Sequence, residues 1–203
     1  MARPIDNEKR RELARRAVAV LQAEGLDLSF AALAERLELK RPTLLYYFPT
    51  KASIIEAALE ELLLAQAAFV IPRMEAEAHP LDQLLAQLVS VHAFHQGRED
   101  RVVFLSQAVA SLGMAGAQRI IDIGNQVFEA QRQVMKGRLQ TAIAEGRMHP
   151  CDVDALMALL RSTVDGMMVQ RFMTGCDVAP VHRFFKERVL DPLRRAPDAE
   201  ESP

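Results

Sequence analysis

The chain has 203 residues, half of them apolar, and a formal net charge of −2 at pH 7. This length can bury one ample core, or a small head and a larger body. No stretch reaches the roughly 18 to 20 apolar residues of a membrane span, and the first residues lack the apolar segment of a secretory signal. We therefore expect a cytoplasmic protein without a membrane partner. Cys151 and Cys176 are too few for a disulfide framework and lack the spacing of a metal site.

The charge is unevenly divided along the chain. Residues 1–51 contain ten Lys and Arg against seven Asp and Glu, a net of +3, which leaves −5 for the rest. A positive N-terminal segment favours contact with an anion at that end. The asymmetry is modest, and it indicates nucleic-acid binding only in combination with a motif.

Residues 6–24 have the pattern of an amphipathic helix. Leu13, Ala17 and Leu21 form its inner stripe, and Gly25 suits its C-terminal end. The outer side carries five cations, which we call the basic flank: Lys9, Arg10, Arg11, Arg15 and Arg16. The sequence leaves two interpretations of this flank open, contact with phosphates or a solvated face.

Two short helical patterns follow within residues 29–51. Ser29 is a good N-cap for the first, whose apolar face is Phe30, Leu33, Ala34 and Leu37. Residues 38–40 leave room only for a turn, and Pro42 then suits the first turn of a second helix because its missing N–H has no partner to lose. Thr50 suits the cap of the next helix. Two short helices around a tight turn are typical of a helix-turn-helix.

The segment RPTLLYYFPTK, residues 41–51, resembles the recognition-helix signature of TetR-family transcriptional regulators. The resemblance covers roughly residues 5 to 60, and the rest of the chain by helical layout alone. It implies that Arg41, Pro42, Tyr46 and Tyr47 contact base edges or the adjacent backbone of DNA. It also implies that Ser29, Thr43 and Lys51 hold phosphates, and that Lys40 places a cation near the DNA.

Three positions depart from the family pattern. Glu38 stands where the family usually has Gly, so the turn must form either without a positive φ or with strain. Leu45 replaces a usual Tyr, and Lys40 replaces a small capping Ser. The alternative to a DNA-binding motif is two ordinary amphipathic helices with half-buried tyrosines.

The remainder reads as helices throughout. Apolar spacing predicts a long helix over residues 50–72, followed by helices over residues 80–96, 98–112, 117–145, 152–173 and 180–190. The predicted fold is therefore all-α with about nine helices. We expect a three-helix DNA-binding head in residues 1–51, a helical effector-binding and dimerisation body in residues 52–196, and a disordered acidic tail in residues 197–203.

His92 and His95 continue an apolar stripe of the helix over residues 80–96. Two imidazoles there suit a metal pair, ligand donors to a pocket, or core-edge histidines satisfied by their neighbours. No third metal ligand has an obvious spacing, so no metal or cofactor is assigned. The helical layout and the resemblance together suggest an effector pocket lined by His92, His95, Phe104, Phe128, Gln131 and Met168.

The last two helices have wide apolar arcs and resemble the pair with which TetR-family proteins build a dimeric four-helix bundle. Gly166 costs about 1 kcal/mol relative to Ala in mid-helix, which is easier to understand if another helix crosses closely there. The predicted dimerisation residues are Val164, Gly166, Met167, Phe184 and Phe185.

These expectations combine into a homodimeric transcriptional regulator rather than an enzyme, with a double-stranded DNA operator and an unknown small-molecule effector as partners. The resemblance implies a repressor that binds an inverted repeat and is released by a mainly apolar effector. Two alternatives stay open: a metal-dependent sensor or enzyme centred on His92 and His95, and a helical ligand-binding protein whose head no longer binds DNA. No nucleophile–base pair, zinc-protease motif or phosphate loop supports an enzyme.

Overall fold

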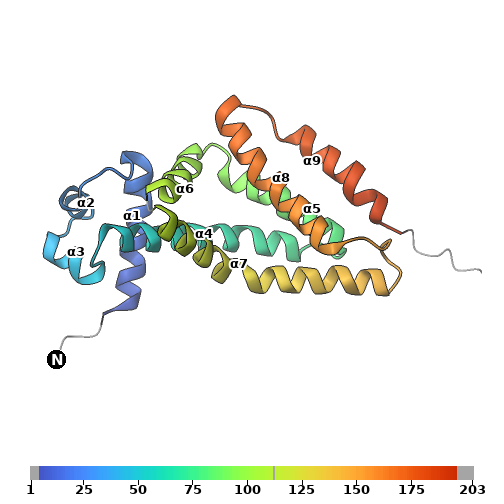
Figure 1. Ribbon diagram of the computed structural model, residues 1–203, viewed down its shortest axis with the longest axis horizontal. Helices are drawn as coiled ribbons and strands as arrows, with labels where there is room; N and C mark the ends of the chain where they lie inside the picture. The colour runs from blue at the N-terminus through green and yellow to red at the C-terminus, as the bar shows by residue number, and fades with distance from the viewer. Residues whose placement is uncertain (1–4, 112, 196–203) are drawn as a thin grey trace, which may run out of the picture. The chain divides into compact units, whose positions relative to one another are not determined.

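The computed structural model describes residues 5–111 and 113–195, and within these ranges the chain is all-α, as predicted. Its nine α-helices are shown in Figure 1. They are α1 (Asn7–Glu24), α2 (Phe30–Arg36), α3 (Arg41–Tyr47), α4 (Lys51–Glu75), α5 (Pro80–His95), α6 (Glu99–Ser111), α7 (Gly113–Ala144), α8 (Val153–Thr174) and α9 (Ala179–Phe185). A π-helical turn (Lys186–Leu190) and a 3-10 turn (Asp191–Leu193) follow α9.

Local capping chemistry sets several helix starts. The carboxylate of Asp6 accepts a hydrogen bond from Lys9 N at 3.0 Å, and that of Asp152 accepts one from Ala155 N at 3.0 Å. Thr50 Oγ1 accepts from Ser53 N at 3.0 Å while Ser53 Oγ accepts from Thr50 N at 3.3 Å. This reciprocal pair satisfies two N–H groups at the start of α4, so the predicted cap at Thr50 is confirmed.

The predicted end of the fourth helix at residue 72 is wrong, because α4 continues through Pro72 to Glu75. A proline inside a helix removes one backbone hydrogen bond and crowds the preceding turn. Here Val70 and Met74, on either side of Pro72, are both buried in the hydrophobic core. Burial of two such side chains contributes roughly 1.5 to 3 kcal/mol each, which offsets the lost hydrogen bond.

The chain divides into two compact units. Unit 1 comprises residues 1–67 and 98–128, and unit 2 comprises residues 68–97 and 129–203. Helices α4 and α7 each contribute residues to both. This division follows contacts within the chain and does not test the functional boundary at residue 51, which stays a prediction. The predicted tail, residues 197–203, lies outside the described residues.

In unit 1, α1, α2 and α3 pack around a small core. Its fully buried members include Leu13 and Leu21 of α1, Leu33 of α2 and Leu44 of α3. Phe48, directly after α3, is fully buried as well. Since these positions are the apolar stripes of the sequence pattern, the predicted three-helix head is confirmed as a packed structure.

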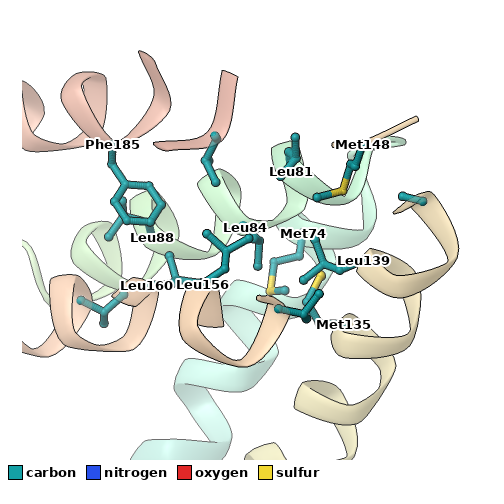
Figure 2. Close-up of a cluster of buried hydrophobic side chains, with 14 of the residues drawn as sticks. Met74, Leu81, Leu84, Leu88, Met135, Leu139, Met148, Leu156, Leu160 and Phe185 are labelled. Atoms are coloured by element: carbon teal, nitrogen blue, oxygen red, sulfur yellow. The ribbon is translucent and has the colours of Figure 1, made fainter. Parts of the chain in front are cut away.

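Unit 2 has the larger core, in which α5 packs against α8 and α9 (Figure 1). Figure 2 shows Leu81, Leu84 and Leu88 of α5 among side chains from α4, α7, α8 and α9. Those partners are Met74, Met135, Leu139, Leu156, Leu160 and Phe185, all buried. The helix α5 is therefore the central element of unit 2.

Backbone hydrogen bonds tie the end of the described chain to the loop before α8. Met148 and Arg194 form an isolated antiparallel bridge, and His149 N donates to Leu193 O at 2.8 Å. Arg195 N donates to Arg147 O at 3.2 Å. These bonds close unit 2 at the α7–α8 loop.

No helix among the described residues is both long enough and apolar enough to cross a lipid bilayer.

We expect Leu84→Ala to destabilise the protein by about 3 kcal/mol, because it removes a fully buried side chain from the centre of unit 2 and leaves a cavity. Val89→Ala, on the same helix but at an exposed position, is the matched control and should change the free energy of unfolding by less than about 0.5 kcal/mol. Urea denaturation measures both. Equal effects of the two substitutions would contradict the assignment of this core.

Candidate nucleic-acid interface

The turn between α2 and α3 is made with a left-handed residue that is not glycine. Leu39 N donates to Ala34 O at 2.9 Å and Glu38 N donates to Glu35 O at 2.9 Å, the two bonds of a Schellman C-cap. This motif needs positive φ after the last helical residues, and Glu38 has φ 58°. Of the two ways left open by the sequence, the turn is therefore formed with strain, which costs an L-residue roughly 1 to 2 kcal/mol.

Ser29 begins α2 as predicted. Its hydroxyl accepts a hydrogen bond from Ala32 N at 3.1 Å. The side chain is exposed, so the same hydroxyl lies at the protein surface. Its predicted contact with a phosphate stays a prediction.

The short helix α3 has one buried side and one open side. Leu44 and Phe48 are fully buried and anchor it to α1 and α2. The open side carries the exposed side chains Lys40, Arg41, Pro42, Thr43 and Tyr46, as the recognition-helix pattern requires. These predicted contact residues are therefore exposed, and their contact with DNA stays a prediction.

The exposure and bonding differ among four positions in or beside α3, namely Tyr47, Lys40, Lys51 and Leu45. Tyr47 is half-buried, and its ring meets the Tyr46 ring edge-on with centroids 5.1 Å apart. Lys40 is the N-cap of α3 without a side-chain capping bond, so its ammonium group is not used to cap the helix. Lys51 is half-buried in the first turn of α4, and Leu45 is exposed where the resemblance expects a tyrosine hydroxyl.

Part of the basic flank is bound to carboxylates of the same unit. The buried carboxylate of Glu61 on α4 accepts from Arg11 Nε at 2.8 Å and lies 3.2 Å from Arg15 Nε. The hydrogen bond to Glu61 raises the pKa of Arg11. Lys9 Nζ pairs with Glu12 at 2.7 Å within α1. These cations connect α1 to α4 or stabilise α1 itself.

The other two arginines of the flank contact the helix-turn-helix. The guanidinium of Arg10 lies 5.0 Å from the centre of the Phe48 ring, in cation–π contact. Arg16 Nη2 donates to Leu37 O at 2.7 Å and lies 3.6 Å from a carboxylate oxygen of Glu38. The sequence left two interpretations of the flank open, contact with phosphates and a solvated face. Neither included these two contacts, because Phe48 and Leu37 are far from Arg10 and Arg16 in the sequence.

A small hollow of about 150 Å³ lies beside Arg10 and Arg11. Its lining consists of Asn7, Arg10, Arg11, Ala14, Ala57, Glu60 and Glu61. Ligand pockets for small molecules usually measure about 300 to 1,000 Å³ and are mostly apolar. The hollow is therefore not a candidate for the mainly apolar effector predicted from the sequence.

His92 is buried and pairs with a histidine that the sequence analysis did not select. Its Nε2 lies 3.0 Å from Val164 O, and its Nδ1 lies 2.6 Å from Nε2 of His182. A carbonyl can only accept, so Nε2 of His92 carries the proton, and Nδ1 then accepts from Nε2–H of a neutral His182. The two rings are parallel to within 9°. Burial lowers the pKa of both imidazoles.

Of the alternatives that the sequence left open, His92 is a core histidine satisfied by its neighbours, and its side-chain partner is His182. His95 is buried separately, with its ring edge-on to Phe94 at 5.0 Å between centroids. Within the described ranges, no group of three or more His, Cys, Asp and Glu side chains is arranged to hold a metal ion. No local sequence signal connects His92 to His182, which is on another helix.

The remaining predicted effector residues are distributed over both units. Gln131 and Met168 are half-buried in unit 2 with His92 and His95, whereas Phe104, which is buried, and Phe128 belong to unit 1. The assignment of these six residues to one pocket stays a prediction.

The predicted dimerisation residues separate into two groups. Val164 and Phe185 are buried in the core of unit 2, against helices of the same chain. The sequence pattern missed this because α8 is apolar on two sides. Phe184 and Gly166 are exposed and Met167 is half-buried, and these three remain on the surface of the chain.

Comparison with known proteins gives a family for the head and a fold for the whole chain. Residues 13–58 match the family described as bacterial regulatory proteins, tetR family. No curated protein sequence matches the chain. The family match contains the whole helix-turn-helix, from the middle of α1 to the first turns of α4.

Solved structures share the fold over nearly the full chain. KstR2, a ketosteroid transcriptional regulator of Mycobacterium tuberculosis, has 22% identity and a TM-score of 0.62, with 95% of this chain and 98% of that chain covered. A protein from Saccharomonospora viridis, assigned as a transcriptional regulator and crystallised with choline, has 20% identity and a TM-score of 0.72, with 94% and 100% covered. FadR from Bacillus subtilis, in complex with stearoyl-CoA, has 16% identity and a TM-score of 0.72, with 90% and 98% covered.

We expect Glu38→Gly to stabilise the protein by roughly 0.5 to 1 kcal/mol, because glycine removes the left-handed strain at some cost in chain entropy. Glu38→Ala removes the same exposed carboxylate but keeps the strain, and it serves as the control. Thermal unfolding measures both variants. A Glu38→Gly protein no more stable than Glu38→Ala would show that the turn stores no strain.

Acid should destabilise unit 2 through its buried histidines. Burial lowers the pKa of His92 and His182 below the value in the unfolded chain, about 6.5. The charge of Arg171 lowers the pKa of His92 further, whereas that of Asp165 raises it. The charge of Asp177 raises the pKa of His182. The unfolded chain therefore binds protons first, so stability is fully present above about pH 6.5 and is lost as the pH falls toward the folded-state pKa values.

Urea denaturation at a series of pH values measures this loss. His182→Gln keeps an N–H donor for His92 but cannot titrate, so it should flatten the decline in the free energy of unfolding. His149→Gln, in the exposed loop before α8, is the control. A decline of the same steepness in both variants would exclude the buried pair as its source.

Proposed function

Residues 13–58 place this chain among the bacterial regulatory proteins of the tetR family, and from this premise we propose that it is a homodimeric, ligand-responsive transcriptional regulator rather than an enzyme or a metal sensor. It acts in the cytoplasm as a repressor on an inverted-repeat operator. The observation that carries the proposal is the open side of α3, where Arg41, Pro42, Thr43 and Tyr46 are exposed on a helix anchored by fully buried Leu44 and Phe48.

The proposed contacts divide by chemistry. Arg41 and Tyr46 carry hydrogen-bonding groups suited to base edges in a major groove, where a correct pair contributes about 1 to 3 kcal/mol of discrimination. Ser29, Thr43, Lys40 and Lys51 suit phosphates, whose contacts fix position and supply salt-dependent affinity. Four of the five cations of the basic flank are bound to carboxylates or to a backbone carbonyl, so we assign the flank no large share of that affinity.

The exposed face of α8 supports a homodimer. Leu159, Gly166, Val169 and Met173 recur at helical spacing on the exposed side of α8, opposite the buried stripe that contains Val164. Apart from its chain neighbours and the backbone of its own helix, a Cβ added to Gly166 would meet no atom of the described residues within 4 Å. A mid-helix glycine next to open, apolar surface suits close approach of a second helix, and cyclic dimers bury the same patch of both subunits. Phe184 on α9, 64% exposed, extends the apolar surface of unit 2.

A small-molecule effector is proposed from the relatives. Choline and stearoyl-CoA, held by the relatives from Saccharomonospora viridis and Bacillus subtilis, differ greatly in size and charge. Proteins of this fold therefore accept diverse ligands, and we propose a small, mainly apolar effector for this chain. An effector that weakens operator binding 100-fold needs a coupling free energy of only about 2.7 kcal/mol.

Fluorescence anisotropy with the purified protein tests the proposal. One labelled duplex is taken from the DNA beside its own coding region, and the other has the same composition in scrambled order. Preferential binding to the first duplex, with an even number of chains per duplex, is expected of a dimeric operator-binding protein. If neither this duplex nor any duplex selected from a random-sequence pool is preferred, the proposed function is wrong.

Two substitutions on the candidate interface should weaken DNA binding in different ways. Arg41→Ala should reduce the preference for the operator over scrambled DNA, with a loss of about 1 to 3 kcal/mol, because a base-edge contact is removed. Lys51→Ala should weaken binding to both duplexes and reduce the slope of log affinity against log salt by about one, because one phosphate contact is removed. Anisotropy at several salt concentrations measures both. Identical behaviour of the two variants would refute the division into base and phosphate contacts.

A further inference from the structure

Two arginines on α1 hold the two ends of the segment that contains α3. Arg16 donates to the carbonyl of Leu37, at the end of α2 and four residues before α3 begins. Arg10 covers the ring of Phe48, the residue that follows α3. Both arginines belong to the basic flank, but their guanidinium groups are directed at the helix-turn-helix itself.

The contact of Arg16 is made at the place where the backbone is under strain. Leu37 is the last residue before Glu38, whose φ of 58° an L-residue adopts only at a cost. The last carbonyls of a helix also lack partners within the helix. A charged donor at 2.7 Å from Leu37 O satisfies one of these carbonyls, and Arg16 also lies 3.6 Å from the Glu38 carboxylate. The guanidinium thus stabilises the strained form of the turn.

The contact of Arg10 fixes the other end. Phe48 is fully buried, so its ring is an anchor of α3 in the core of unit 1. A guanidinium over an aromatic face contributes about 0.5 to 2 kcal/mol. With only seven residues in α3, the direction of the helix depends on the segments at its two ends.

We propose that Arg16, supported by Arg10, is a positioning residue for DNA recognition: it holds α3 in register without itself binding a phosphate. This inference rests on the proposed function. It assigns Arg16 a role in sequence preference, whereas a cation that neutralised a phosphate would contribute to salt-dependent affinity for any sequence.

The test compares Arg16→Gln with Lys9→Gln. Each substitution removes one positive charge from α1, but the Lys9 ammonium group pairs within α1, with Glu12, which also lies 4.0 Å from Arg16 Nη1. The probe is the duplex that the wild-type protein selects from a random-sequence pool, measured against a scrambled duplex over a salt series. Arg16→Gln should lower the preference for the selected duplex about tenfold, the effect of one charge-assisted hydrogen bond, with no greater change in salt slope than Lys9→Gln.

A second measurement does not require DNA. Hydrogen exchange of the free protein should be about tenfold faster at the Glu38 and Leu39 amides in Arg16→Gln, and unchanged in Lys9→Gln. In a Glu38→Gly background, where the turn is no longer strained, Arg16→Gln should lower the preference for the selected duplex by a smaller factor than it does in the wild type. Arg16→Lys, which keeps a charge and one donor, replaces Arg16→Gln if that variant does not fold, and it should show a smaller change in the same direction.

The outcomes separate the inference from the proposed function. A wild-type protein that selects no duplex would overturn the proposed function, and with it a role of Arg16 in recognition. A protein that selects a duplex, but whose Arg16→Gln variant keeps its preference and loses one unit of salt slope, would identify Arg16 as a phosphate contact and overturn the inference alone. Unchanged exchange at Glu38 and Leu39 would overturn it as well.

Discussion

The candidate interface on α3 depends on one constraint, the reversal of the chain within residues 37–40. The reversal requires a left-handed residue at position 38, where this chain has a glutamate instead of the glycine that would adopt that conformation without cost. Two backbone hydrogen bonds close the turn, and the side chain of Arg16 reaches it from α1. The direction in which α3 presents its exposed residues therefore depends on the geometry of this turn.

Unit 2 is organised around a different element, the helix α5. Its leucines fill the core of the unit, and its buried His92 accepts from His182 and donates to the carbonyl of Val164. The hydrogen bonds therefore connect α5 to both α8 and α9. A buried polar group with every nitrogen satisfied in this way favours one packing arrangement over others, because any shift of α8 or α9 leaves a polar atom unpaired.

Much of the fold can be predicted from local patterns in the sequence. The wrong predictions concern features that depend on contacts between residues far apart in the sequence. Ser29 and Thr50 were predicted as caps because a cap is set by the next few residues. The end of α4 was placed at Pro72 because the sequence does not show that Val70 and Met74 are buried. The partner of His92 was missed because His182 is ninety residues away. Periodicity identified apolar positions on α8 and α9 but not which of them face their own chain, and so Val164 and Phe185 were assigned to a dimer face.

The strict division of α3 into anchored and exposed positions has a consequence for evolution. Leu44 and Phe48 account for its packing, while Arg41, Thr43 and Tyr46 make no contribution to the core. Substitutions at surface positions usually change stability by less than about 0.5 kcal/mol. A gene duplicate of this protein can therefore diverge at the exposed positions without passing through an unfolded variant, whereas a change at the anchoring positions is exposed to selection on folding before any new specificity arises.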